Sequence, residues 1–206
     1  MKNAIKNKIF DFAYHEALND ATMQQAYSGN KNKIENNIDA KNLVKKYIDS
    51  ILCGEDIDFY NIANQLLEQI GDNDFTFGNA QKLINMTAKY ICISAYSDEK
   101  AAKNICKFHC PMDSKMISKV VATYRDAIKQ DVSADKQILK LTDKSESWSS
   151  VRWSKIKENN GIHSIDTYKK YQKMVKYLSE NTCFDSESGK QIKMSPIEYD
   201  FWIWNP

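Results

Sequence analysis

The chain has 206 residues, which suits one domain or one domain with an appendage. A chain of this length buries about 70% of the surface that it exposes when unfolded, so neither a disulfide nor a metal is needed for stability. Its hydrophobic content of 42% is typical of a globular protein, and its net charge of only +2 does not indicate bulk attraction to nucleic acid.

Lysine supplies nearly all of the positive charge. Of the 29 basic residues, only Arg125 and Arg152 are arginines. Because arginine is the usual bidentate reader of phosphate and guanine, a sequence-specific DNA reader is not expected.

The cysteines and the N-terminal stretch indicate the compartment. An odd number of widely spaced cysteines favours free thiols in a reducing environment. The stretch MKNAIKNKIFDFAYHEALND is amphipathic and has no apolar run of signal-peptide length. We therefore expect a cytoplasmic protein without a transmembrane segment. The cysteines are Cys53, Cys92, Cys106, Cys110 and Cys183.

Apolar residues recur at helical spacing in the first third of the chain. A long helix is expected over about 3–28, followed by a polar loop over 30–38. Two amphipathic helices follow, one from the cap Asp39 to Gly54 and one over about 58–70. One face of the first helix is expected to hold Ile5, Ile9, Phe12, Ala13, Ala17 and Ala21.

The stretch over about 76–96 is the most distinctive helix of the chain. From Leu83 on, apolar residues fall on nearly every side, which is typical of a helix buried on most of its faces. Its length approaches that of a membrane span, but Lys82, Asn85 and Lys89 lie inside it and would be costly in lipid. We expect this helix to be the centre of a bundle.

The second half of the chain again shows helical patterns. A helix capped by Asp113 is expected over about 113–130, and another over about 164–180. Between them the pattern loosens. Trp148 and Trp153 lie close together there, and we expect a packing site rather than a recognition surface.

The C-terminal tail leaves two alternatives open. The stretch Ser195-Pro196-Ile197-Glu198 is a capping box with proline at the first helical position, which favours a short helix. The aromatic run Tyr199–Trp204 instead favours a strand, which could pair with Lys190–Met194 in a small hairpin. In either form, so many aromatic side chains are expected to be buried on the body or in a partner.

Together these patterns predict an all-α fold. We expect an irregular bundle of six to eight helices around the central helix, with a short helical piece from about residue 97. Residues 1–181 are expected to form a helical domain, and residues 182–206 an aromatic appendage packed on it.

A line of polar residues runs along the central helix. Lys82, Asn85, Lys89 and Cys92 lie at i, i+3, i+7 and i+10, and therefore share one side of it. The surface alternative is a solvated stripe. The functional alternative is a partly buried site that holds a ligand.

The segment HCPMDS follows soon after this helix. If the chain turns back there, Lys82 and Asn85 could meet His109 and Asp113. Such a cluster contains an acid, a base and two donors, a combination that a nucleotide or phosphodiester site can use. The structural alternative is that Asp113 only caps the next helix.

Two signatures in this region resemble helical bacterial proteins that have no named activity. They are FGNAQKLINM and HCPMDS, together with the later Trp153-Ser154-Lys155-Ile156. The resemblance covers about 75–156. It implies that the polar residues of the two signatures act as a unit, and it assigns no catalytic role.

Metal, cofactor and nucleophile sites are not indicated. Cys106, His109 and Cys110 resemble part of a zinc site, but the fourth ligand would have to be the distant Cys92 or Cys183. His109 and Cys110 are direct neighbours, and adjacent residues rarely reach each other as base and nucleophile. The chain also contains no phosphate-binding loop, dinucleotide fingerprint or hydrolase motif.

The helix over about 164–180 carries a basic face. Lys169, Lys173 and Lys176 lie at i, i+4 and i+7, interleaved with tyrosines as on surfaces that bind single-stranded nucleic acid. The alternative is an ordinary amphipathic helix with lysines outward and tyrosines inward. Non-specific RNA or DNA binding through this face is therefore a third functional hypothesis.

The first hypothesis is a small binding protein of a bacterium or a mobile element. It would hold a protein or nucleotide partner near Lys82, Asn85 and Lys89, and its size and lack of catalytic motifs would fit a role in conflict between phage and host. The second is a small enzyme that acts on a nucleotide or nucleic acid, with His109 and Asp113 as acid and base. No sequence feature fixes the oligomeric state.

Overall fold

The protein is all-α. The computed structural model describes residues 2–95, 102–130, 135–141, 147–157, 161–184 and 188–204. These residues form eight α-helices and four 3-10 turns. Among them no β-strand forms, only two isolated bridges, and no helix is both long and apolar enough to cross a bilayer. The predicted fold class is confirmed.

The chain divides into two compact units, Met1–Phe108 and His109–Pro206. The boundary that we expected between residues 181 and 182 falls inside the second unit.

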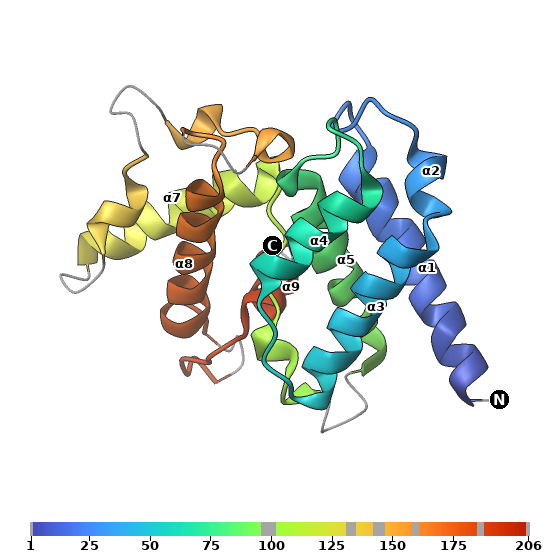
Figure 1. Cartoon of the computed structure of the whole chain (residues 1–206). Coiled ribbons are helices and arrows are strands. Elements are labelled where there is room, and N and C mark those ends of the chain that lie inside the picture. The colour runs from blue at the N-terminus through green and yellow to red at the C-terminus, as the bar shows by residue number, and fades with distance from the viewer. Residues whose placement is uncertain are drawn as a thin grey trace. The chain divides into compact units, whose positions relative to one another are not determined.

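Helix α5 is the centre of the first unit. It packs along α1 in the most extensive helix contact of this unit, and it also packs against α4, which pairs with α3 (Figure 1). The buried central helix that the sequence predicts is thus present. The helices are α1 (Lys2–Thr22), α2 (Lys31–Glu35), α3 (Ile38–Cys53), α4 (Phe59–Ile70) and α5 (Phe77–Ala95), followed by the 3-10 turn η1 (Ile105–Lys107).

Local side-chain chemistry sets the ends of α3 and α4. The Asn37 side chain accepts from the Ala40 amide and caps α3, so Asp39 lies in the first turn and is not the cap that we expected. Gly54 and Gly71 end the two helices with φ of 100° and 59°, which only glycine adopts without strain.

The start of the chain differs from the prediction. α1 ends at Thr22, several residues before the expected end, and Gln24 and Gln25 follow it with φ of 56° and 64°. The expected polar loop contains the short helix α2, whose cap is Asn30. At the end of α1, the Asn79 side chain of α5 donates to the carbonyls of Ala21 and Ala26.

The second unit is built on the pair α7 and α8, with α9 packed on α8. The Lys119 ammonium of α7 donates to the carbonyl of Ile203 at 2.8 Å, which also ties α9 to α7. The elements are α7 (Ser114–Gln130), α8 (Ile165–Asn181), α9 (Pro196–Trp204), and the 3-10 turns η2 (Lys136–Leu139), η3 (Trp148–Ser150) and η4 (Trp153–Lys155).

The tail forms the helix and not the hairpin. The amide of Ser195 donates to Glu198 Oε2 at 2.7 Å, and the amide of Glu198 donates to Ser195 Oγ at 3.3 Å, which completes the predicted capping box. The alternative prediction of a strand over Tyr199–Trp204 is wrong, because these residues belong to α9. Among the described residues of the tail region, an isolated bridge joins Phe184 and Gln191.

The tryptophan region packs inside the second unit. Trp148 is buried, and its indole N–H donates to the Leu139 carbonyl at 3.0 Å. Trp153 is half-buried in η4. Residues 131–134 and 142–146 of the loosely patterned stretch lie outside the described residues, as does most of the helical piece expected from residue 97.

Candidate functional site

The polar line of α5 lies mainly inside the first unit. Asn85 and Cys92 are fully buried, and Lys82 and Lys89 are half-buried. The Asn85 amide donates to Gln81 Oε1 at 3.3 Å, so a buried amide pair forms one turn apart on the same helix. Only the two lysines therefore reach the surface, and the line is not an open polar groove.

His109 and Asp113 have structural contacts within the second unit. Asp113 Oδ1 accepts from the Met116 amide at 2.8 Å and caps α7, as the sequence predicts. His109 Nδ1 shares a hydrogen bond of 3.0 Å with the hydroxyl of Tyr168 on α8. Because Lys82 and Asn85 belong to the other unit, the cluster of four residues stays a prediction.

The segment after His109 is clamped to α8. The Gln172 side chain accepts from the Cys110 amide at 3.1 Å and donates to the Cys110 carbonyl at 2.7 Å, as a neighbouring strand would. The Tyr171 hydroxyl donates to the Pro111 carbonyl at 2.9 Å and lies 3.4 Å from Cys110 Sγ. Burial first, and then the nearby thiol, holds the pKa of Tyr171 well above its usual value.

This clamp gives residues of the HCPMDS segment a structural role. Cys110 is fully buried and bonded on its backbone, so the native fold does not present its thiol to a substrate. No group of three potential ligands that could hold a metal occurs within the described part of the chain.

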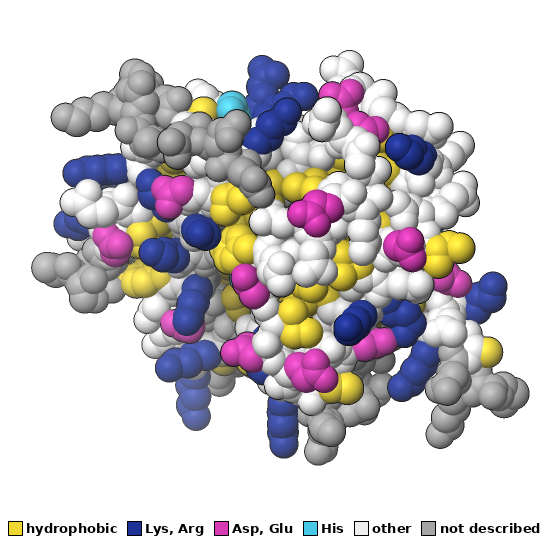
Figure 2. Space-filling view, in the orientation of Figure 1, with side chains coloured by type: hydrophobic (Ala, Val, Ile, Leu, Met, Phe, Trp, Pro, Cys, Tyr) yellow, Lys and Arg dark blue, Asp and Glu magenta, His cyan; other side chains and the backbone are white. Residues whose placement is uncertain are grey.

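The basic face of α8 is a surface feature. Lys169, Lys173 and Lys176 are all exposed on one side of the helix, and Figure 2 shows basic side chains in a row along its position. Tyr168 and Tyr171 are fully buried on the opposite side. The tyrosines point inward, so this face offers charge but not these rings for stacking.

The solvent face of α1 is the surface that the sequence prediction missed. Ile5 is 54%, Ile9 38% and Phe12 64% exposed, whereas Ala13 and Ala17 are buried. Our single buried face was therefore wrong: residues 4–9 are exposed on every side of α1, and the row that contains Ile5 and Ile9 becomes buried only from Ala13 on. We call Ile5, Ile9 and Phe12 the outer stripe.

The outer stripe has the spacing of a helix-packing seam. Its residues are separated by four and then three positions, and Glu16 and Asn19 continue the same alternation. Apolar residues at alternating spacings of three and four are the pattern by which two helices pack side by side. This spacing is readable in the sequence. The alanines at 13, 17 and 21 continue the row of Ile5 and Ile9, however, and this led us to expect one buried face.

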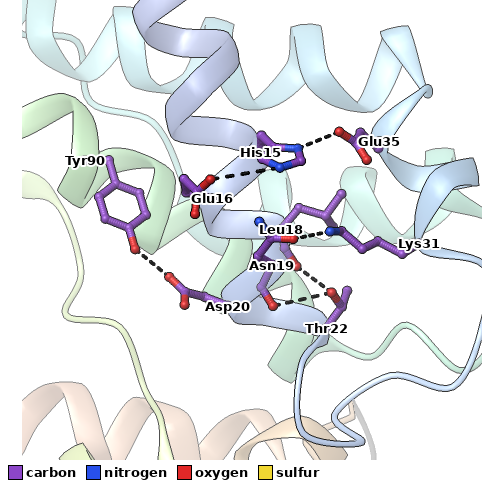
Figure 3. Close-up of polar contacts among 9 residues, drawn as sticks. All are labelled: His15, Glu16, Leu18, Asn19, Asp20, Thr22, Lys31, Glu35 and Tyr90. Carbon is purple, nitrogen blue, oxygen red and sulfur yellow. Dashed lines mark hydrogen bonds and ion pairs between the residues drawn. The ribbon is translucent and has the colours of Figure 1, made fainter.

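Polar contacts fix the C-terminal half of α1 (Figure 3). His15 Nδ1 lies 2.6 Å from the Glu35 carboxylate of α2, and the Lys31 ammonium donates to Asn19. On α5, the Tyr90 hydroxyl donates to Asp20 at 2.7 Å. The surface of α1 thus changes along its length. It is apolar at the outer stripe, and further along it carries polar side chains that are bonded to α2 and α5.

Charge is also divided along α1. Lys2, Lys6 and Lys8 lie in its first half, Asp11 lies next to its midpoint, and Glu16 and Asp20 lie in its second half. This order opposes the helix dipole, which favours acids at the N-terminus and bases at the C-terminus.

Comparison with known proteins assigns no family. No protein-family model, no curated protein and no solved structure matches the chain. The resemblance to helical bacterial proteins stays a prediction. A functional assignment therefore depends on the geometry of the chain itself.

Proposed function

We propose that this protein is a protein-binding module whose partner docks a helix on the outer stripe of α1. The observation that carries the proposal is the exposure of Ile5, Ile9 and Phe12 in one row. Single exposed apolar residues are ordinary, but an aligned row of large ones indicates an interaction surface.

The shape of this surface suits a helical partner. α1 has 21 residues and is therefore about 30 Å long. An amphipathic helix with apolar residues at spacings of three and four could lie along it and cover the stripe. Phe12, the most exposed member, is the expected anchor, because aromatic residues dominate the energy of such interfaces.

The part of α1 that carries Phe12 is packed on the first unit. Ala13, Ala17 and Ala21 are buried, and these small side chains allow close packing of α1 on α5. A surface held in place before binding loses little conformational entropy when the partner docks, which favours affinity.

Comparative co-purification tests the proposal. Tagged wild type, Phe12→Glu and the control Phe184→Glu would be recovered from cells that express the chain, and bound proteins quantified by mass spectrometry. Phe184 is a fair control because it is 55% exposed and lies in the other unit. We expect a protein that Phe12→Glu loses and Phe184→Glu retains; equal recovery by all three forms would contradict the proposal.

A second candidate function is non-specific nucleic-acid binding through α8. The shared exposure of Lys169, Lys173 and Lys176 favours it. Three phosphate contacts predict that the logarithm of affinity for a single strand falls with the logarithm of salt at a slope of about −2. Fluorescence anisotropy with an oligonucleotide measures that slope, and replacing all three lysines by alanine should abolish binding. A signal that is absent or insensitive to salt would remove this candidate.

A further inference from the structure

We infer that the helix docked on the outer stripe is α1 of a second copy, which runs antiparallel to the first. This inference rests on the proposed function and names its partner. A two-fold symmetric interface needs one surface that is complementary to itself. The outer stripe and the charge order of α1 together supply such a surface.

The apolar part is complementary to itself by spacing. Ile5, Ile9 and Phe12 alternate at four and three positions, so each can sit between residues of the same row on the second copy. All three are exposed within their own chain and are available to a second one.

The charged part is complementary only when the two helices are antiparallel. Lys6 and Lys8 are exposed in the first half of α1, and Glu16 is 40% exposed in the second half. An antiparallel partner places the basic half of each copy beside the acidic half of the other. A parallel partner would place lysines beside lysines, and like charges side by side are unfavourable.

The dipole of α1 favours the same direction. Lysines near the positive end and acids near the negative end destabilise a lone helix. The chain offsets part of this by itself, because Asp11 pairs with Lys41 at 2.6 Å and Asp20 accepts from Tyr90. Antiparallel pairing offsets more of it, because the negative end of one helix then lies beside the lysines of the other.

Sedimentation equilibrium of the full chain tests the inference. Wild type would be measured from about 1 μM to about 1 mM, a range that covers weak dimers. We expect a reversible dimer, a dissociation constant at least about 30-fold higher for Phe12→Glu, and no change for the control Phe184→Glu. Circular dichroism of each variant would check that its helices are intact.

A charge variant tests the antiparallel direction. Lys6→Glu with Lys8→Glu makes both halves of α1 acidic, and we expect it to weaken the dimer by about 10-fold. These acids lie near the N-terminus of α1, where the dipole favours them, so the loss would not come from unwinding of the helix. High salt should reduce the difference between the dissociation constants of this variant and of wild type.

The outcomes separate the inference from the proposed function. A wild type that stays monomeric over the whole range, or a dimer that Phe12→Glu leaves intact, would overturn the α1 pairing. A dimer strengthened by Lys6→Glu with Lys8→Glu would overturn the antiparallel direction. The wild type could instead be monomeric and bind a different protein that the Phe12→Glu variant does not bind. That result would support the proposed function and overturn the self-pairing.

Discussion

Asn79 is a buried amide that joins the start of α5 to the end of α1. Its Nδ2 donates to the carbonyls of Ala21 at 2.7 Å and Ala26 at 3.1 Å, and its Oδ1 accepts from the amide and the hydroxyl of Thr76. All four hydrogen-bonding positions of the side chain are therefore used. This single residue explains why α1 stops where it does.

We expect Asn79→Asp to be strongly destabilising. At neutral pH a carboxylate would face the carbonyls of Ala21 and Ala26, and the free energy of unfolding should fall by about 3 kcal/mol. Burial would raise the pKa of the new carboxyl, so part of the loss should be recovered as the pH falls and the group is protonated. Urea unfolding at several pH values measures both effects.

The exposed Asn42→Asp on α3 is the matched control for that variant. It makes the same chemical change on the surface and should alter the free energy of unfolding by less than about 0.5 kcal/mol. Equal effects of the two variants would contradict the role assigned to Asn79.

The bond from Tyr27 to Asp72 predicts a pH-dependent contribution to stability. The Tyr27 hydroxyl donates to Asp72 Oδ2 at 2.6 Å, and this bond, followed by that from the Asp74 amide, holds the pKa of Asp72 below its usual value. A lowered pKa adds stability above the unfolded value of about 3.9, and the addition is lost as the pH falls through the folded value. Tyr27→Phe should cost about 1 kcal/mol at pH 7 and progressively less below about pH 4.

Tyr14→Phe provides the comparison. Tyr14 is buried, and its hydroxyl has no hydrogen-bond partner among the described residues. Removing that hydroxyl should leave stability unchanged or slightly higher at every pH, because no bond is lost. A penalty for Tyr27→Phe that did not vary with pH would argue against the Asp72 bond.

The cysteines should differ sharply in reactivity. Cys53 and Cys106 are exposed, whereas Cys92, Cys110 and Cys183 are buried. Burial raises the pKa of the Cys183 thiol to about 11, so on the order of one molecule in a thousand would carry the thiolate at pH 8. Iodoacetamide followed by peptide mass spectrometry should label only the two exposed thiols until the protein is unfolded; rapid labelling of Cys183 would contradict its burial.

At the scale of the element, the apolar residues of α1 have two different roles. Ala13, Ala17 and Ala21 are buried where α1 packs on α5, and the outer stripe faces solvent. Replacing Ile5 and Phe12 with serine should therefore change the free energy of unfolding by less than about 0.5 kcal/mol per residue. Ala17→Leu on the buried face should cost about 1–3 kcal/mol, because α5 leaves no room for the added atoms. Thermal unfolding measures the stability of the serine variants and of Ala17→Leu. A large loss of stability in the serine variants would mean that the outer stripe supports the fold.

Many helix ends governed by local chemistry were predictable from sequence, although the local caps Asn30 and Asn37 were missed. The glycines after α3 and α4, the caps Asp113 and Ser164, and the capping box of α9 each act within a few residues of the chain. The end of α1 was not predictable, because it depends on an amide that lies more than fifty positions away in the sequence. Which apolar residues of α1 are buried also depends on the fit to α5 rather than on spacing alone.

At the scale of the whole molecule, the sequence predicted the fold class but not its division. The boundary between Phe108 and His109 falls inside the region of the two signatures, where no glycine-rich or proline-rich linker marks it. The polar line on α5 was readable as a line, but its burial at Asn85 and Cys92 follows from packing. The surface with the clearest potential for binding is instead on α1, outside both signatures.

Site-specific photo-crosslinking tests this central claim most directly. Benzoylphenylalanine would replace Phe12 or, as the matched control, Phe184, in cells that express the chain; both side chains are more than half exposed. We predict a crosslinked product from position 12 alone, formed with a second copy or with a helix of another protein. No product from position 12, or equal products from both positions, would contradict the claim that α1 is the binding surface.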